Sequence, residues 1–209
     1  YLINSVTIGL QFVDKKYIKE LFEINKFFLD LKVMPIKEGE YFLNLMFDSI
    51  FIVALAADEI DFAEKFLVEY GPQLSPDNRD NYLMLFGSIL ELYKKNYEES
   101  LSLLSKIQLK DPPTKMRVRM LYFMNYYELN SFESALSLLD SFKHFLSENK
   151  KLPEYLFEAF TISVKYSAKI LNAKMNNKKL DYAIYKEAKS AEVLYSNRDW
   201  ILTKMEELI

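Results

Sequence analysis

The chain has 209 residues, of which 50% are hydrophobic and 27% charged, as in an ordinary folded domain. Its net charge of −3 argues against nucleic acid as a partner, because phosphate binding depends on a large excess of Lys and Arg. The absence of cysteine excludes a disulfide framework, a thiolate metal site and a cysteine nucleophile.

The first forty residues favour two amphipathic helices. Leu2, Val6, Leu10 and Val13 recur at helical spacing, and the polar run from Asp14 follows them. A second helix is predicted by another apolar set, Ile18, Leu21, Phe22, Phe28 and Leu29. It ends before a connection that contains Pro and Gly. Only 4 Gly and 6 Pro occur in the whole chain, which favours long helices over strands joined by many turns.

Tyr41 to Ala57 is the most apolar stretch of the chain. A membrane span requires roughly 20 apolar residues, whereas this run is shorter and contains Asn44 and Asp48. We therefore predict a helix that is buried on most sides, and no transmembrane segment.

Similar segments recur at a fixed spacing. Tyr97 opens YEESLSLL and Phe132 opens FESALSLL, 35 positions apart, and Phe62 lies another 35 positions earlier. Self-similarity at a period of about 20 to 50 residues is typical of repeat architectures, in which small units stack side by side.

The residues before each aromatic residue share a buried pattern. Counting back from Phe62, Tyr97 and Phe132, the same four offsets carry apolar residues in all three units, and these offsets lie on one helical face. Each unit is therefore predicted to be two antiparallel helices joined by a short polar turn. The four positions, in unit order, are Ile50, Leu85 and Met120; Phe51, Phe86 and Leu121; Ala54, Ile89 and Met124; Ala57, Leu92 and Tyr127.

These units resemble the tetratricopeptide repeat. Tyr97 to Leu101, with Asp111-Pro112 following, is similar to the second helix of that repeat, and Leu83, Phe86, Gly87 and Leu90 are similar to the large-large-small-large pattern of its first helix. The repeat period is 35 residues in this chain, whereas it is 34 residues in the family. The small residue found at Ser100 and Ala135 is replaced by Lys65 in the first unit.

The resemblance implies an all-α fold: a right-handed α-α superhelix, that is, a solenoid of antiparallel helix pairs. We expect a single domain over 1–209, with degenerate repeats at about 1–40, 41–75, 76–111 and 112–148 and C-terminal capping helices at about 152–209. In this last region, Leu156, Phe160, Val164, Leu171 and Met175 predict one long helix, and Leu180 to Tyr195 predicts another. Asn197 is a candidate N-cap for a final helix with Ile201, Met205 and Leu208 on its apolar face.

The tail from Asn197 to Leu208 also resembles the end of uncharacterised bacterial proteins of this repeat type. That resemblance implies a bacterial source. A cytoplasmic location is the expectation, and because the chain starts at Tyr1 rather than Met, a targeting signal could lie upstream.

An aromatic cluster with two arginines is the candidate site for a partner. Aromatic rings supply rigid contact area, and Arg can anchor a carboxylate. The competing interpretation places the rings in the core between repeats and the arginines on the surface. The five residues are Arg117, Arg119, Tyr122, Tyr126 and Tyr127.

Catalytic chemistry finds no support in the sequence. His144 is the only histidine, and a zinc site without a second His or any Cys would be unusual. There is no Gly-rich phosphate loop and no nucleophile motif. We therefore expect no enzyme, no cofactor and no metal.

Two functions remain open. The first is a non-enzymatic scaffold that holds a peptide or helix of a protein partner on stacked helix pairs. The second is a structural or regulatory segment of a larger protein, which packs against upstream repeats or self-associates as a homo-oligomer.

Overall fold

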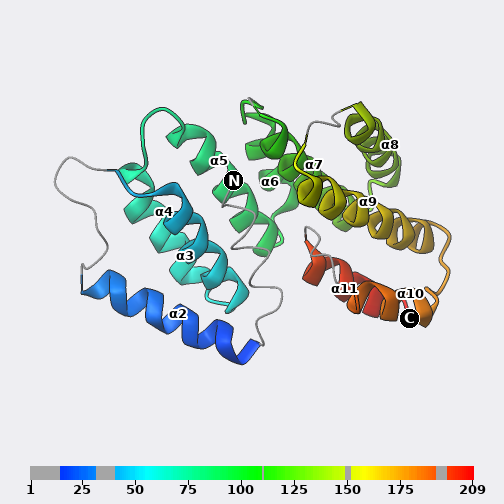
Figure 1. Cartoon of the computed structure of the whole chain (residues 1–209), viewed down its shortest axis with the longest axis horizontal. Coiled ribbons are helices and arrows are strands. Elements are labelled where there is room, and N and C mark those ends of the chain that lie inside the picture. The colour runs from blue at the N-terminus through cyan, green and yellow to red at the C-terminus, as the bar shows by residue number, and fades with distance from the viewer. Residues whose placement is uncertain (1–14, 32–40, 110, 149–151, 192–196) are drawn as a thin grey trace. The chain divides into compact units, whose positions relative to one another are not determined.

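The computed structural model describes residues 15–31, 41–109, 111–148, 152–191 and 197–209 (Figure 1). Within this part of the chain there are ten α-helices and one short 3-10 helix, and no strand forms. The prediction of an all-α protein is confirmed. The helix predicted over Tyr1 to Val13 lies outside the described residues, as does the connection through Pro35 and Gly39.

The chain divides into two compact units, Tyr1–Gln108 and Leu109–Ile209. In the described part of the first unit, each α-helix packs against the next along the chain. These elements are α2 (Lys15–Asp30), α3 (Asn44–Ala56), α4 (Ile60–Tyr70), η1 (Gly71–Gln73), α5 (Arg79–Tyr93) and α6 (Tyr97–Ser105).

A chain of aromatic rings forms the core of the first unit. Phe47 of α3 contacts Phe66 of α4 at 4.8 Å between ring centroids and Phe86 of α5 at 5.1 Å. Phe51 contacts Phe86 at 5.0 Å, and none of these four rings is more than 2% exposed. The part of the predicted stretch that forms α3 is therefore core, as predicted, whereas Tyr41 and Leu43 before it are 54% and 58% exposed.

The second unit is built on α7 and α9. Helix α8 lies between α7 and α9 along the chain and packs against both of them. Helix α9 also contacts α11, which in turn contacts α10. Their shared core includes Met120, Phe142, Phe160 and Ile201, all buried. The bounds are α7 (Pro112–Glu128), α8 (Phe132–Glu148), α9 (Glu154–Met175), α10 (Tyr182–Lys189) and α11 (Arg198–Glu206).

Most of the predicted C-terminal pattern is confirmed. Four of the five residues predicted for the apolar face of α9 are buried, whereas Met175 is 40% exposed. Helix α10 is shorter than the range predicted for it. Asn197 occupies the N-cap position of α11, but it does so in the left-handed conformation with a φ of 57°, and its side chain makes no capping hydrogen bond.

Three helix hairpins are closed by the same backbone turn. The residue after the C-cap has a positive φ in each: 66° at Asp58, 64° at Lys95 and 56° at Asn130. The N–H of this residue donates a hydrogen bond to the carbonyl three residues earlier. The N–H of the next residue donates to the carbonyl five residues earlier, as Asn96 N does to Glu91 O at 2.8 Å. This pattern is the Schellman motif, which satisfies the carbonyls left open at a helix end.

The turns correct the register predicted for the first unit. From Asp58 to Lys95 the spacing is 37 residues, whereas from Lys95 to Asn130 it is 35. The counterpart of Tyr97 is therefore Ile60 and not Phe62. The prediction was wrong here because α3 is buried on nearly all sides, so its apolar pattern fits either register.

The corrected register restores the small residue that the sequence pattern lacked. Ala63, Ser100 and Ala135 each lie four residues after the turn's last residue, and all three are 0% exposed. Ser100 Oγ donates to the Ser88 carbonyl at 2.8 Å, so α5 and α6 approach closely. A Cβ on Gly87 would lie 3.2 Å from Leu103, which agrees with the small position predicted there.

We predict that Lys95→Gly raises the free energy of unfolding by about 1 kcal/mol. The left-handed conformation costs a residue with a Cβ roughly 1 to 2 kcal/mol, which Gly avoids. Denaturant unfolding followed by circular dichroism would measure the change.

Lys106→Gly is the matched control, because Lys106 is the C-cap of α6 with a φ of −90°. No gain is expected there. Equal effects of the two substitutions would contradict a strained turn at Lys95.

Candidate interaction surface

Helix α7 begins at a well-defined cap. Asp111 Oδ1 accepts from the backbone N–H of Thr114 at 2.9 Å, and its Oδ2 accepts from the Thr114 hydroxyl at 2.8 Å. Pro112 occupies the first turn, where its missing N–H has no helical partner. The cap therefore fixes the residue at which the helix begins. That start determines the direction around the helix axis in which each later side chain points.

Three of the five predicted site residues share one face of α7. Arg119, Tyr122 and Tyr126 follow one another at spacings of three and four residues, which brings side chains together on a helix. The Tyr122 and Tyr126 rings lie 5.8 Å apart. All three side chains are partly buried. We call these three residues the α7 face.

Arg119 lies over two rings of the neighbouring helix. Its guanidinium carbon is 4.4 Å from the centroid of the Phe145 ring and 5.9 Å from that of Phe142, both in α8. Burial lowers the pKa of Arg119, but arginine remains charged in proteins. The α7 face thus carries a fixed positive charge beside its tyrosines.

The other two predicted residues lie elsewhere. Tyr127 is 1% exposed and belongs to the core of the second unit, as the competing interpretation had it. Arg117 precedes Arg119 by two residues, so it projects from the other side of α7. The structure brings together Arg119, Tyr122 and Tyr126 and separates Arg117 and Tyr127 from them.

A polar cluster at the end of α7 joins three helices. Glu128 Oε1 accepts from Trp200 Nε1 at 2.9 Å and lies 3.0 Å from Lys204 Nζ, both on α11. The Trp200 ring packs edge-on against Phe123 and Tyr127, at 5.9 and 5.2 Å. From α9, Lys174 Nζ donates to the Tyr127 carbonyl at 3.0 Å. We call this set the C-terminal cluster.

The ion pair of this cluster is shielded from water. The side chains of Lys204 and Glu128 are 14% and 15% exposed. Burial works against the charge of Lys204, but the hydrogen bonds that Lys204 donates to the Glu207 and Glu128 carboxylates outweigh burial and raise the pKa of Lys204. For Lys174 burial is the larger effect and lowers the pKa. The cluster therefore holds α11 onto α7 by charge as well as by packing, and Lys174 joins α9 to the end of α7.

Little in the sequence pattern predicts this cluster. Ile201 and Met205 were predicted to be buried, and both are 0% exposed. Trp200 and Glu128 are 72 positions apart, and no periodic pattern links residues at such a distance. The one available signal was that Trp200 is the only tryptophan of the chain.

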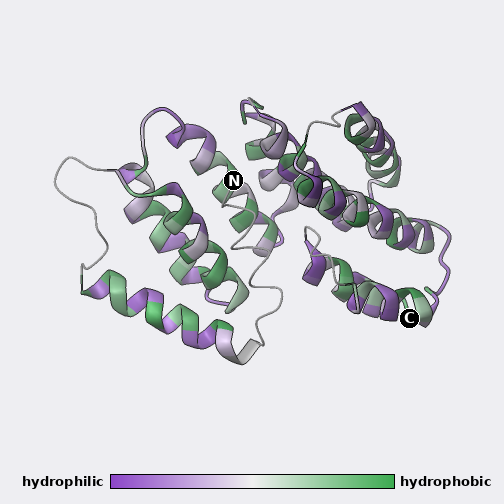
Figure 2. Ribbon diagram, in the orientation of Figure 1, coloured by the Kyte–Doolittle hydropathy of each residue, from purple (hydrophilic) through white to green (hydrophobic). Residues whose placement is uncertain are grey.

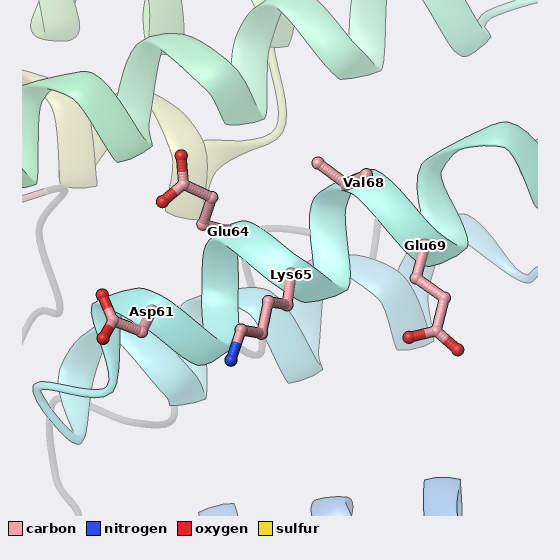
Figure 3. A pocket seen from close by; sticks show the side chains of 5 residues that line it. All are labelled: Asp61, Glu64, Lys65, Val68 and Glu69. Atoms are coloured by element: carbon pink, nitrogen blue, oxygen red, sulfur yellow. The ribbon is translucent and has the colours of Figure 1, made fainter.

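A shallow hollow lies on α4 (Figure 3). Its lining residues all come from that one helix: Asp61, Glu64, Lys65, Val68 and Glu69. Lys94, the C-cap residue of α5, forms an ion pair with Glu64. Because one helix lines the hollow and no groups converge on it from several elements, it lacks the features of a ligand site.

The described residues contain no group of three or more acidic or histidine side chains that could hold a metal ion. His144 is exposed on α8. None of the helices in the described ranges combines the length and the apolar character that crossing a membrane requires. Comparison with models of protein families, with curated proteins and with solved structures finds no match.

We predict that Glu128→Gln lowers the free energy of unfolding by about 1 to 3 kcal/mol. Glutamine can still accept from Trp200, but Lys204 loses a buried charged partner. Denaturant unfolding at pH 7 would measure the loss.

The control is Asp140→Asn, which removes a pair with the same N–O distance of 3.0 Å whose side chains are 55% and 59% exposed. Such exposed pairs contribute roughly 0 to 1 kcal/mol. If both substitutions lower the free energy of unfolding by the same amount, burial does not strengthen the pair between Glu128 and Lys204.

We also predict a loss of stability between pH 10 and about 12. Burial raises the pKa of Tyr166 to about 12 and raises that of Tyr127 further, from an ordinary value of 10.0. The unfolded chain therefore loses these protons first, so stability is complete below pH 10 and falls as pH rises. Thermal unfolding followed by circular dichroism across this range would measure the decline.

Tyr127→Phe should flatten that decline, because one fewer proton is released on unfolding. The slope would fall by up to about 1.4 kcal/mol per pH unit. Parallel curves of stability against pH for the variant and the natural chain would contradict the assignment of part of this decline to Tyr127.

Proposed function

We propose that this protein is a non-enzymatic interaction module, in which stacked helix hairpins similar to tetratricopeptide repeats hold a peptide or helix of a partner protein. The repeat interpretation is supported by three hairpins that share the same turn and carry a small buried residue at the same position. A right-handed superhelical stacking, a bacterial source and a cytoplasmic location belong to the same proposal.

The observation that carries the proposal is the α7 face. Tyr122 and Tyr126 offer large, rigid rings, the type of side chain that dominates binding energy at interfaces. Arg119 is held against Phe145, and its guanidinium carries five N–H donors, one of which the Lys115 carbonyl accepts at 3.5 Å. A peptide with aromatic or apolar anchors and a carboxylate suits this combination.

Selection from a displayed peptide library, with the whole chain as bait, would test the proposal. Selected peptides should bind the natural chain, and Tyr122→Ala combined with Tyr126→Ala should weaken binding at least tenfold, because each aromatic anchor is worth roughly 1 to 2 kcal/mol or more. Fluorescence anisotropy with purified peptide would measure the affinity, and circular dichroism would verify the fold.

The matched control is Tyr155→Ala combined with Tyr182→Ala, which removes two tyrosines that are 46% and 53% exposed on α9 and α10. This variant should bind as the natural chain does. Equal affinity in the natural chain and the α7 variant would remove the α7 face from the proposal.

A second candidate is a structural or regulatory segment that packs against further repeats or another copy. The observation that favours it is the set of exposed apolar side chains on α2 and directly after it, among them Phe27 at 58% and Leu31 at 54%. Large exposed apolar patches mark interaction sites. Sedimentation velocity tests the self-association form of this second candidate, because a monomer at all concentrations contradicts it.

A further inference from the structure

Helix α11 is fixed to α7 and to the core of the second unit by one of its sides. Trp200, Ile201, Lys204 and Met205 lie one, three and one positions apart, which places all four on the same side of the helix. Ile201 and Met205 are 0% exposed, and Trp200 and Lys204 both reach Glu128. Figure 2 shows hydrophobic and hydrophilic segments along α11. The attached side of α11 is therefore partly apolar and partly polar.

The surface under Trp200 and Lys204 is held together by contacts that do not involve α11. The rings of Phe123 and Tyr127 lie 6.1 Å apart within α7. Lys174 of α9 donates to the Tyr127 carbonyl at 3.0 Å, and its Nζ lies 4.1 Å from the centroid of the Tyr127 ring. Glu128 follows as the last residue of α7. We call Phe123, Tyr127, Glu128 and Lys174 the α11 seat.

Helix α11 is weak by itself. It has nine residues, too few for a stable isolated helix. Asn197 at its N-cap makes no side-chain hydrogen bond, whereas Asp111 and Asp181 cap α7 and α10 in this way. Its bond to α10 from Arg198 Nη2 to the Lys189 carbonyl, at 2.6 Å, is exposed, so water can replace it. We therefore expect α11 to open at a lower free energy than the rest of the unit.

The polar part of the seat selects the chemistry of its occupant. The Glu128 carboxylate accepts from the Trp200 indole at 2.9 Å and pairs with Lys204 at 3.0 Å. A shielded ion pair adds little stability compared with apolar packing, because both charges give up water. A helix without these two groups, however, would leave Glu128 buried without its donors, which is costly.

We propose that the α11 seat is a docking site for a helix of a partner protein, and that α11 is the resident occupant which the partner displaces. The partner helix carries a Trp, an apolar residue directly after it and a Lys four positions after the Trp, as α11 does. A longer helix with a capped N-terminus gains what α11 lacks. This surface is additional to the α7 face and does not depend on it.

A second copy of the chain suits the seat less well. Its α11 has the same sequence as the resident helix, so it offers no better contacts. The resident helix is joined to its seat by the backbone, which gives it an effective concentration on the order of millimolar. Another copy would have to reach a similar concentration to compete.

A labelled peptide tests the proposal with the whole chain. The probe is a synthetic peptide of residues 197–209 with fluorescein at its N-terminus. The receptor is the chain with Trp200→Ala and Lys204→Ala, which remove both groups that reach Glu128 and so weaken the resident helix. This opened chain should bind the peptide at least tenfold more tightly than the natural chain does, because an intact α11 competes for the seat. Fluorescence anisotropy would measure both affinities, and circular dichroism would verify the fold.

Two controls separate the seat from general adhesion. Adding Glu128→Gln to the opened chain should weaken peptide binding at least tenfold, because the peptide's Lys204 loses its charged partner. Thr203→Ala in the peptide should leave the affinity unchanged, since Thr203 is exposed and its hydroxyl donates to Asp199 within α11.

Three outcomes would overturn the proposal. The first is an absence of binding to the opened chain, and the second is equal affinity for the opened chain with and without Glu128. The third is a dimer of the natural chain, seen by light scattering, that excess peptide dissociates. That result would assign the seat to α11 of a second copy.

Hydrogen exchange followed by NMR tests the opening in the natural chain, without any substitution. The amides of residues 202–206 in α11 should exchange at least tenfold faster than those of residues 166–171 in α9, because α11 opens while α9 stays folded. Equal protection of the two helices would mean that α11 opens only when the whole unit unfolds, and would overturn the proposal.

Discussion

The described hairpins depend on one constraint: two helices must reverse direction within three residues and still pack closely. The turn meets the first half of this requirement through a left-handed residue and two backbone hydrogen bonds, at Asp58, Lys95 and Asn130 alike. The buried Ala63, Ser100 and Ala135 meet the second half, since a larger side chain there would separate the helices. Packing of neighbouring hairpins in each unit builds on these pairs.

The second unit adds a different solution at its C-terminal side. Helix α11 has only nine residues, too few to be stable by propensity alone. The C-terminal cluster compensates, because Trp200 and Lys204 both reach Glu128 while Ile201 and Met205 enter the core. Packing and a shielded ion pair thus hold a helix that would not form in isolation.

The helices and most buried positions could be predicted from the sequence, because both follow from the local spacing of apolar residues. All twelve residues predicted at the four shared offsets are buried, including Ala54, Ile89 and Met124. Leu136, an apolar residue four positions after Phe132, is by contrast 47% exposed. The register of the first unit and the Glu128–Trp200 contact could not be predicted, because backbone turns at Asp or Lys and contacts between distant residues leave no periodic trace.

The turns within the hairpins are uniform, but the connections between hairpins are not. Eight residues separate α4 from α5, and six separate α6 from α7. Differences in length therefore fall in these connections and in the helices, outside the three-residue turns that pair the helices. A detector that assumes a constant period will align such a chain incorrectly, as the 37-residue step from Asp58 to Lys95 shows. Divergent members of this architecture are better sought with a rigid hairpin template and a variable spacer.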